Sequence, residues 1–333
     1  MKLEQMPRYP LLCGFTPLQR MENLEQALGC GPLYIKRDDL TPLGLGGNKT
    51  RKLEFLLGDA LAGGADTLVT VGGVQTNHGR LTAAAAAKAG LACTLVLDGA
   101  RPEELSGNLL LDCLLGASLV YTDGRSTSAV IEETLAALRA AGRAPYFIPE
   151  GGSNAVGSAG YLAMVPELLA QAGSLPVPPA RLVCTMGSLG TFAGLWLGAR
   201  AFGAPFSVTG VAVNPTTGYT REKAAALVNE MSAAYGLDIA AALEDMDIIY
   251  ADAAHDYAGS GYNVPDAKTR GAVELLARTE GIFLDPCYTA KSFRGFCDIA
   301  RELDGGAIFV HTGGTPALWT QEHLDAFAAD YWN

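Results

Sequence analysis

The sequence predicts an α/β protein built on two open, twisted, mostly parallel sheets that are flanked by helices. From about residue 32 onward, short apolar runs alternate with longer helical runs, and this spacing is typical of βαβ units. The chain has 333 residues, of which 49% are hydrophobic and 18% charged, so it can build a large core. Its 40 glycines follow no triplet period and belong in turns and close backbone contacts.

The expected strands end in polar or glycine-rich loops, and a helix follows most of them. Along the chain we expect strands at 33–39, 67–71, 93–97, 118–122, 144–149, 181–186, 206–213 and 307–312. We expect helices from about residue 48, at about 75–89, 107–115, 127–141 and 155–171, and from residue 190. In open parallel sheets, ligands bind outside the carboxyl ends of the strands, so the loops that follow the strands are the places to search.

Two weak boundaries divide the chain, one near residues 50–54 and one near residues 151–158. The four strand–helix repeats between them suffice for a small sheet of their own. We therefore expect a small α/β domain, residues 54–158, inserted into a large domain made of residues 1–53 and 159–333.

Charge and composition exclude several classes of partner. The net charge is −11 and no basic block occurs, so we expect no nucleic-acid partner. No apolar run approaches the ~18 residues of a membrane span, and the start of the chain lacks a secretion-type apolar segment. Seven cysteines without a CxxC pair predict reduced thiols, and four scattered histidines predict no metal site. We expect a cytoplasmic protein without a membrane partner.

A basic cluster at residues 45–54 places Lys49, Arg51 and Lys52 in the first turn of a helix, directly after glycines. Cations are unfavourable at this positive end of the helix dipole. Either the turn is solvated, or it binds an anion or contains a lysine with a lowered pKa that serves as nucleophile or base. A nucleotide P-loop, and with it a phosphotransferase, is disfavoured because Asn48 stands where that motif needs glycine.

A second cluster, residues 71–80, follows an expected strand and opens an alanine-rich helix. Its free amides, together with Thr76 and Asn77, could bind a carboxylate-sized anion, and His78 could carry a proton. The alternative is an ordinary loop in which Thr76 caps the helix.

A third cluster, residues 185–191, has the strand, Gly/Ser/Thr loop and uncharged helix start that cradle a phosphate. It lacks the dinucleotide spacing, so a phosphate without a nucleotide fits better than a dinucleotide, and a plain glycine turn remains the alternative. Further on, Tyr262, the run 285–289 and the run 311–315 could add side chains to a site, although such tyrosines are often core or rim residues.

A lysine at a glycine-flanked helix start, a carboxylate loop and a separate phosphate loop together suggest pyridoxal 5'-phosphate. The motifs IKRDDL, GGNKTRKLEF, GGVQTNHGR, GYNVP, LDPCYT and HTGGTPAL occur in this order over nearly the whole chain. In these motifs the chain resembles the D-cysteine desulfhydrase and 1-aminocyclopropane-1-carboxylate deaminase family of fold type II (tryptophan synthase β-like) pyridoxal-phosphate enzymes.

This resemblance implies a role for each candidate residue. It places the cofactor on Lys49 as a Schiff base, Asn77 beside the cofactor's ring hydroxyl, and Thr312 near its ring nitrogen. It implies that the substrate is held by Thr76, Asn77, His78, Tyr262, Tyr288 and Thr289, and that Lys49, Tyr288 and Tyr262 are catalytic. The implied phosphate contacts are Lys52, Gly187, Ser188, Leu189, Gly190 and Thr191.

The resemblance implies a β-eliminating lyase, with D-cysteine as the leading substrate. The alternatives are L-cysteate, which would release sulfite, and 1-aminocyclopropane-1-carboxylate. Thr76 replaces the family's usual serine and narrows or reorients the substrate pocket, while Thr289 replaces the glutamate of the deaminase branch. An amino-acid-binding sensor with the same fold is the non-enzyme alternative, against which the intact Lys49 argues. The family also suggests a homodimer.

Overall fold

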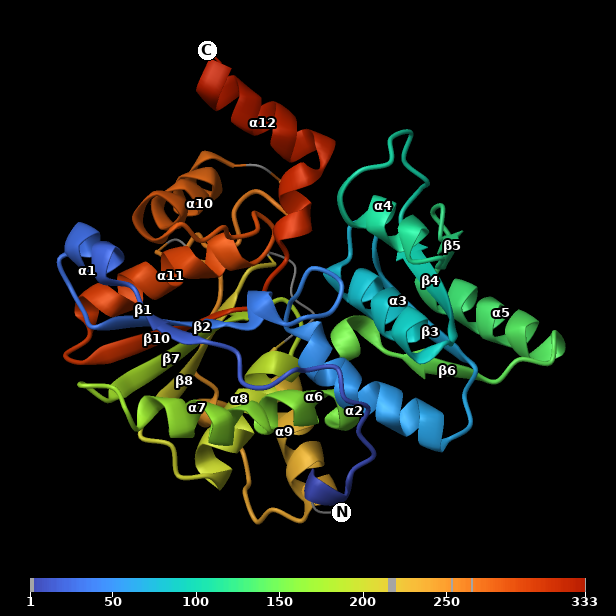
Figure 1. Ribbon diagram of the computed structural model, residues 1–333, viewed down its shortest axis with the longest axis horizontal. Helices are drawn as coiled ribbons and strands as arrows, with labels where there is room; N and C mark the ends of the chain where they lie inside the picture. Colours follow the sequence, from blue (N-terminus) through green and yellow to red (C-terminus); the bar gives the residue numbers. More distant parts are fainter. Residues whose placement is uncertain (1–2, 215–219, 253, 265, 333) are drawn as a thin grey trace.

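The computed structural model describes residues 3–214, 220–252, 254–264 and 266–332, and its strands form two sheets that lie side by side (Figure 1). The six-stranded sheet has the order β1-β2-β10-β7-β8-β9, and the four-stranded sheet has the order β5-β4-β3-β6. The pair β1–β2 is antiparallel, and all other described pairs are parallel. The predicted fold class is confirmed.

The elements alternate along the chain as the sequence predicts. The strands are β1 (Leu18–Arg20), β2 (Leu33–Arg37), β3 (Thr67–Gly73), β4 (Ala92–Asp98), β5 (Ser118–Tyr121), β6 (Pro145–Ile148), β7 (Pro179–Met186), β8 (Ser207–Ala212), β9 (Ile248–Ile249) and β10 (Gly306–His311). The helices are α1 (Glu22–Leu28), α2 (Lys49–Ala62), α3 (Asn77–Ala89), α4 (Gly107–Leu114), α5 (Thr127–Ala140), α6 (Ala155–Leu162), α7 (Met164–Ala172), α8 (Gly190–Ala201), α9 (Arg221–Tyr235), α10 (Ala267–Glu280), α11 (Thr289–Glu302) and α12 (Gln321–Trp332).

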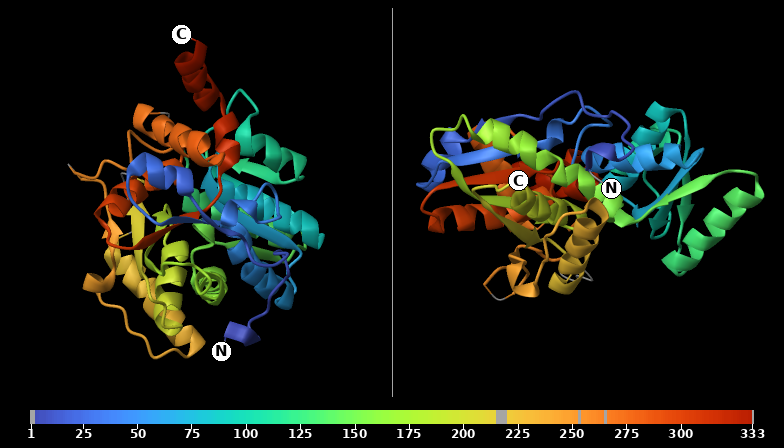
Figure 2. Two further views of the ribbon diagram at one scale, coloured as in Figure 1. Left: turned by 60° about the vertical axis from the view of Figure 1, so that its left-hand side comes forward. Right: turned by 90° about the horizontal axis from the view of Figure 1, so that it is seen from below.

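The six-stranded sheet is buried on both faces, so its strands contribute alternate side chains to two cores. In β10, Ile308 and Val310 pack into one core with α6, α8 and α9, whereas Phe309 packs into the other with α10 and α11. Two views in Figure 2 show these helix layers on either side of the sheet. This period of two is the expected consequence of strand geometry.

A third core joins β3, β4 and the helices α2 and α3 of the smaller sheet. Helix α2 contributes to two cores, because Leu53 and Leu56 belong to this one while Phe55 packs with α6 and α8. The predicted domain boundaries at 53/54 and 158/159 therefore fall inside α2 and α6. The domain division itself stays a prediction.

The prediction of one helix over residues 155–171 is wrong. The segment forms two helices, α6 and α7, that meet at Ala163. Pro166 has no N–H for the carbonyl of Leu162, four residues earlier, and the continuous helix breaks there. Strands β1 and β9 and helices α1, α9, α10, α11 and α12 were not predicted individually. No helix in the described ranges is long and apolar enough to cross a membrane.

Candidate active site

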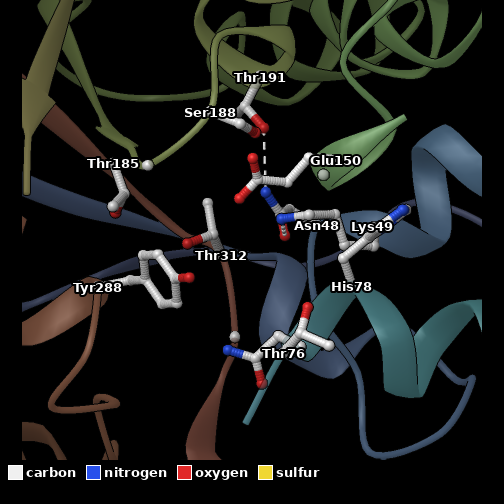
Figure 3. Close-up of a pocket in the computed structure, with 14 residues that line it drawn as sticks. Asn48, Lys49, Thr76, His78, Glu150, Thr185, Ser188, Thr191, Tyr288 and Thr312 are labelled. Atoms are coloured by element: carbon white, nitrogen blue, oxygen red, sulfur yellow. Dashed lines mark hydrogen bonds between the residues drawn. The ribbon is translucent and has the colours of Figure 1, made fainter. Parts of the chain in front are cut away.

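A pocket of about 630 Å³, including its open mouth, lies between the two sheets at the carboxyl ends of their strands (Figure 3). The pocket is lined by Asn48, Lys49, Thr76, Asn77, His78, Glu150, Gly151, Thr185, Gly187, Ser188, Thr191, Tyr288, Thr312 and Gly313. The three sequence clusters thus meet at one site, as the alternation of strands and helices predicts.

Lys49 is the first residue of α2 and donates to the Oδ1 atom of Asn48 over 3.0 Å. Burial, followed by the nearby charge of Arg80, lowers its pKa to about 8. The preceding turn needs glycine, since Gly46 has φ +73° and a Cβ there would lie 1.8 Å from the carbonyl oxygen of Asp39. A lysine with a lowered pKa suits a nucleophile or a base.

The cations at the start of α2 are compensated in different ways. Arg51 forms buried ion pairs with Asp38 at 2.8 Å and Glu167 at 2.9 Å. Lys52 is also fully buried, but it donates to neutral oxygens, the carbonyl of Gly151 at 2.9 Å and the hydroxyl of Ser153 at 3.3 Å. Burial, and then the charge of Lys49, holds the pKa of Lys52 well below its usual value. An anion beside Lys52 would stabilise its charged form.

The loop 187–189 at the start of α8 faces Lys52. Ser153 links the segments, donating to Ser188 over 2.9 Å and accepting from the Gly190 amide over 3.2 Å. A Cβ at Gly190 would lie 2.7 Å from the Nζ atom of Lys52. Gly187, Ser188 and Thr191 line the pocket, whereas Leu189 and Gly190 are not among the lining residues.

The end of the loop between β3 and α3 supplies Thr76 to the pocket wall, and the first turn of α3 supplies Asn77 and His78. Thr76 caps α3, its hydroxyl oxygen accepting from the amide of Gly79 over 3.3 Å. His78 is buried, and burial together with the charges of Lys49 and Lys52 holds its pKa well below the usual value. His78 is therefore neutral near pH 7, whatever its role.

The opposite wall is formed by Tyr288 and Thr312. Burial raises the pKa of Tyr288 well above its usual value, so its phenol is neutral. Tyr262 does not line the pocket but packs edge-on against Tyr288, with ring centroids 5.7 Å apart. The hydroxyl of Thr289 is buried and donates to the Oδ1 atom of Asp285 over 2.6 Å, so the structure does not bring it to the pocket wall.

Sequence reasoning gave no role to several lining residues. Asn48, Thr185 and Gly313 lie inside its clusters, and Gly151 lies at its second domain boundary. Glu150 went unnoticed although it follows β6, and the rule that ligands bind beyond the carboxyl ends of strands could have pointed to it.

The chain belongs to the pyridoxal-phosphate-dependent enzymes, because the model of the family "Pyridoxal-phosphate dependent enzyme" matches residues 10–313. It is 39% identical over 322 residues to a putative 1-aminocyclopropane-1-carboxylate deaminase from Pyrococcus abyssi, covering 95% of this chain and 94% of that one. It is 41% identical over 328 residues to a D-cysteine desulfhydrase from Yersinia enterocolitica, covering 96% and 97%. A crystal structure of a 1-aminocyclopropane-1-carboxylate deaminase homologue superposes with a TM-score of 0.86 at 36% identity, covering 98% and 96%.

These findings confirm the predicted family, enzyme class and cofactor. The pocket also fits pyridoxal phosphate on its own chemistry. Lys49, a lysine with a lowered pKa, stands in the wall. Behind the wall, the buried amine of Lys52 lies beside Gly190 at the start of α8, where a glycine and hydroxyl loop suits a phosphate. The roles of the individual site residues stay predictions.

Proposed function

We propose that this chain is a D-cysteine desulfhydrase, a lyase that converts D-cysteine and one water into pyruvate, hydrogen sulfide and ammonia. The observation that carries the proposal is the full-length similarity, at 41% identity, to the Yersinia enterocolitica D-cysteine desulfhydrase. The pocket supports the proposal, because it is lined by Lys49, by Thr76 at a helix start suited to a carboxylate, and by the phenol of Tyr288.

Pyridoxal phosphate, when bound, supplies an electron sink that makes the Cα proton of an amino acid acidic. We propose that Lys49 binds the cofactor and accepts this proton. A pKa of about 8 leaves an appreciable neutral fraction of amine near neutral pH, whereas an ordinary lysine is almost wholly protonated. Lys52 and the loop residues Gly187, Ser188, Leu189, Gly190 and Thr191 would hold the phosphate, with Asn77 and Thr312 near the ring.

The substrate carboxylate fits the start of α3. The Thr76 oxygen accepts from the Gly79 amide, which leaves the hydroxyl hydrogen available to a carboxylate alongside the first helix amides. Neutral Tyr288 can donate its proton to the sulfur as the Cβ–S bond breaks, and Tyr262 packs against its ring. We propose further substrate contacts for Asn77, His78 and Thr289.

A second candidate is 1-aminocyclopropane-1-carboxylate deaminase. It is favoured by the similarity to the Pyrococcus abyssi protein, which bears that name as a putative assignment. One observation speaks against it. Position 289, after Tyr288, holds a threonine that donates to Asp285, where the deaminase branch has a glutamate.

The decisive experiment measures pyruvate and 2-oxobutyrate release from D-cysteine, L-cysteine, L-cysteate and 1-aminocyclopropane-1-carboxylate in parallel. The proposal expects D-cysteine to give the largest kcat/KM and Lys49→Ala to lose at least about 10³-fold on it. Turnover of the cyclopropane substrate alone would establish the second candidate. Equal inactivity on all four would refute both.

We also propose that the protein is a cytoplasmic homodimer with a small domain at residues 54–158. All seven cysteines are unpaired, which suits a reducing compartment. The dimer is proposed on the family resemblance, and light scattering of the purified protein tests it.

A further inference from the structure

Arg80 is a fully buried cation that lies behind the pocket wall rather than in it. It belongs to the first turn of α3, and its three hydrogen-bond partners are neutral oxygens. Its Nε atom has no hydrogen-bond partner among the described residues. Burial lowers the pKa of Arg80 to about 10, which leaves it charged at neutral pH. The nearby carboxylates of Asp112 and Asp285 favour its charge, but neither is among its hydrogen-bond partners in the described residues. A buried charge that is only partly compensated is costly, so this position calls for a functional explanation.

The two ends of the guanidinium join separate parts of the site. The Nη2 atom donates to the carbonyl of Gly46 over 2.9 Å, three residues before Lys49. The Nη1 atom donates to the Oδ1 atom of Asn108 over 2.8 Å and to that of Asn77 over 3.3 Å. The rigid guanidinium of Arg80 thus links the turn that precedes Lys49 to Asn77, the first residue of α3.

The same contacts decide which way the amide of Asn77 faces. Its Oδ1 atom accepts from Arg80 and, over 2.9 Å, from the Nδ2 atom of Asn108. Two donors on this oxygen direct the Nδ2 donor the other way, toward Gly314, where an added Cβ would lie 3.0 Å from it. Asn77 lines the pocket, so the orientation fixes what it offers a ligand.

We propose that Arg80 is a positioning residue of the active site, which fixes the Asn77 amide and the Gly46 turn and keeps a permanent positive charge behind Lys49. The inference deepens the proposed function and rests on the pyridoxal-phosphate site described above.

The charge acts on Lys49 together with several other groups. Arg80 and His78 face it from α3, Lys52 from α2, Glu150 from the turn after β6, and Asp285 from the turn before α11. After burial, Arg80 is the largest influence and lowers the pKa of Lys49, while Asp285 and Glu150 oppose it. Removing the charge should therefore raise the pKa.

The first experiment uses the full-length chain freed of cofactor. The rate at which a water-soluble amine reagent labels Lys49 is followed against pH by mass spectrometry, with circular dichroism as the folding check. The wild-type midpoint is expected near pH 8. Arg80→Met should raise it by roughly 0.5–1 unit, and Arg80→Lys should keep it within about 0.3 unit. Lys88→Met, which removes an exposed cation from the same helix, should leave it unchanged.

The second experiment measures the Kd of pyridoxal phosphate by absorbance titration. Arg80→Lys keeps the charge but loses the fork, so its Kd should rise roughly tenfold. An unchanged midpoint in Arg80→Met, or an unchanged Kd in Arg80→Lys, overturns the proposal. If Arg80→Met does not fold, the Kd of pyridoxal phosphate for Arg80→Lys still decides whether the proposal holds. Neither the labelling midpoint nor the Kd of pyridoxal phosphate depends on an amino-acid substrate. Inactivity on D-cysteine would therefore refute the proposed substrate and leave this inference standing.

Discussion

An ammonium that is poorly solvated and has no carboxylate partner favours its neutral form. Among the described residues, the first turn of α2 holds two such lysines, the half-buried Lys49 and the buried Lys52. The sequence showed that these charges needed an explanation, but it did not show that Arg51 between them is paired with Asp38 and Glu167. Glu167 lies 116 residues further along the chain, and only the tertiary fold brings it there. Lys49 and Lys52 form no ion pair with a described residue, so they remain available to an anionic cofactor.

Gly190 tests the proposed phosphate loop at a single atom. A Cβ added there would lie 2.7 Å from the Nζ atom of Lys52 and 2.8 Å from the hydroxyl of Ser158, so both side chains would have to move. Gly190→Ala should raise the Kd of pyridoxal phosphate about tenfold or more, measured by absorbance titration. Gly271→Ala is the matched control, because a Cβ at Gly271 meets nothing within 4 Å. Equal affinities in the two variants would place the phosphate elsewhere.

Replacing Asp112 by asparagine is expected to stabilise the protein by an amount that depends on pH. The two carboxylate oxygens of Asp112 have no hydrogen-bond partner in the part of the chain that the structure describes, and burial raises its pKa from 3.8 to about 7. Between these pH values the folded state binds more protons than the unfolded state, so the free energy of unfolding falls as pH rises. Asp112→Asn should be nearly neutral at pH 4 and should raise the free energy of unfolding at pH 8 by roughly 1–3 kcal/mol.

Urea unfolding at the two pH values measures this difference, with the exposed Asp304→Asn as a control that should change stability little at either. A gain of equal size at pH 4 and pH 8 would contradict the assignment of a raised pKa to Asp112.

At the scale of elements, the sequence predicted the strands better than the helices. Apolar runs such as 181–186 and 307–312 lie in β7 and β10, because strands buried on both faces must be apolar along their whole length. The combination of a lysine, a carboxylate loop and a phosphate loop, which suggested pyridoxal phosphate, also predicted that the loops after β3 and β7 meet at one site. Thr289 shows the limit, since its hydroxyl is bonded to Asp285, four residues earlier, and the sequence does not reveal which way a side chain faces.

Helix α2 is held at the end that carries Lys49 by Arg51, which ties it to Asp38 after β2 and to Glu167 in α7. Arg51→Met would leave two buried carboxylates with less compensation and should lower the free energy of unfolding by roughly 3–5 kcal/mol. Arg125→Met, which removes the exposed ion pair with Glu133, should cost less than about 1 kcal/mol. Denaturant unfolding of both variants makes the comparison, and equal losses would show that the buried cluster does not anchor the helix.

At the scale of the whole molecule, the pocket joins two sheets that have separate cores. Thr76 comes from the loop after β3 of the four-stranded sheet and His78 from the helix that follows it, whereas Ser188 and Thr312 come from loops after β7 and β10 of the six-stranded sheet. Helices α2 and α6 pack against each other and carry the chain between the two sheets (Figure 1). A ligand in the pocket therefore contacts loops from both sheets at once.

This arrangement predicts that pyridoxal phosphate stabilises the molecule as one unit. At a free concentration 100 times its Kd, a ligand that binds only the folded state adds about 2.7 kcal/mol to the free energy of unfolding. For a chain of this size the Tm should rise by about 5 °C, within a single calorimetric transition. Scanning calorimetry of the cofactor-free and cofactor-saturated protein measures this rise in Tm.

Pyridoxal, which lacks the phosphate that Lys52 and the 187–191 loop are proposed to hold, is the control and should give a much smaller rise in Tm at the same concentration. A rise confined to one of two separate transitions would show that the cofactor is bound by one sheet's loops alone.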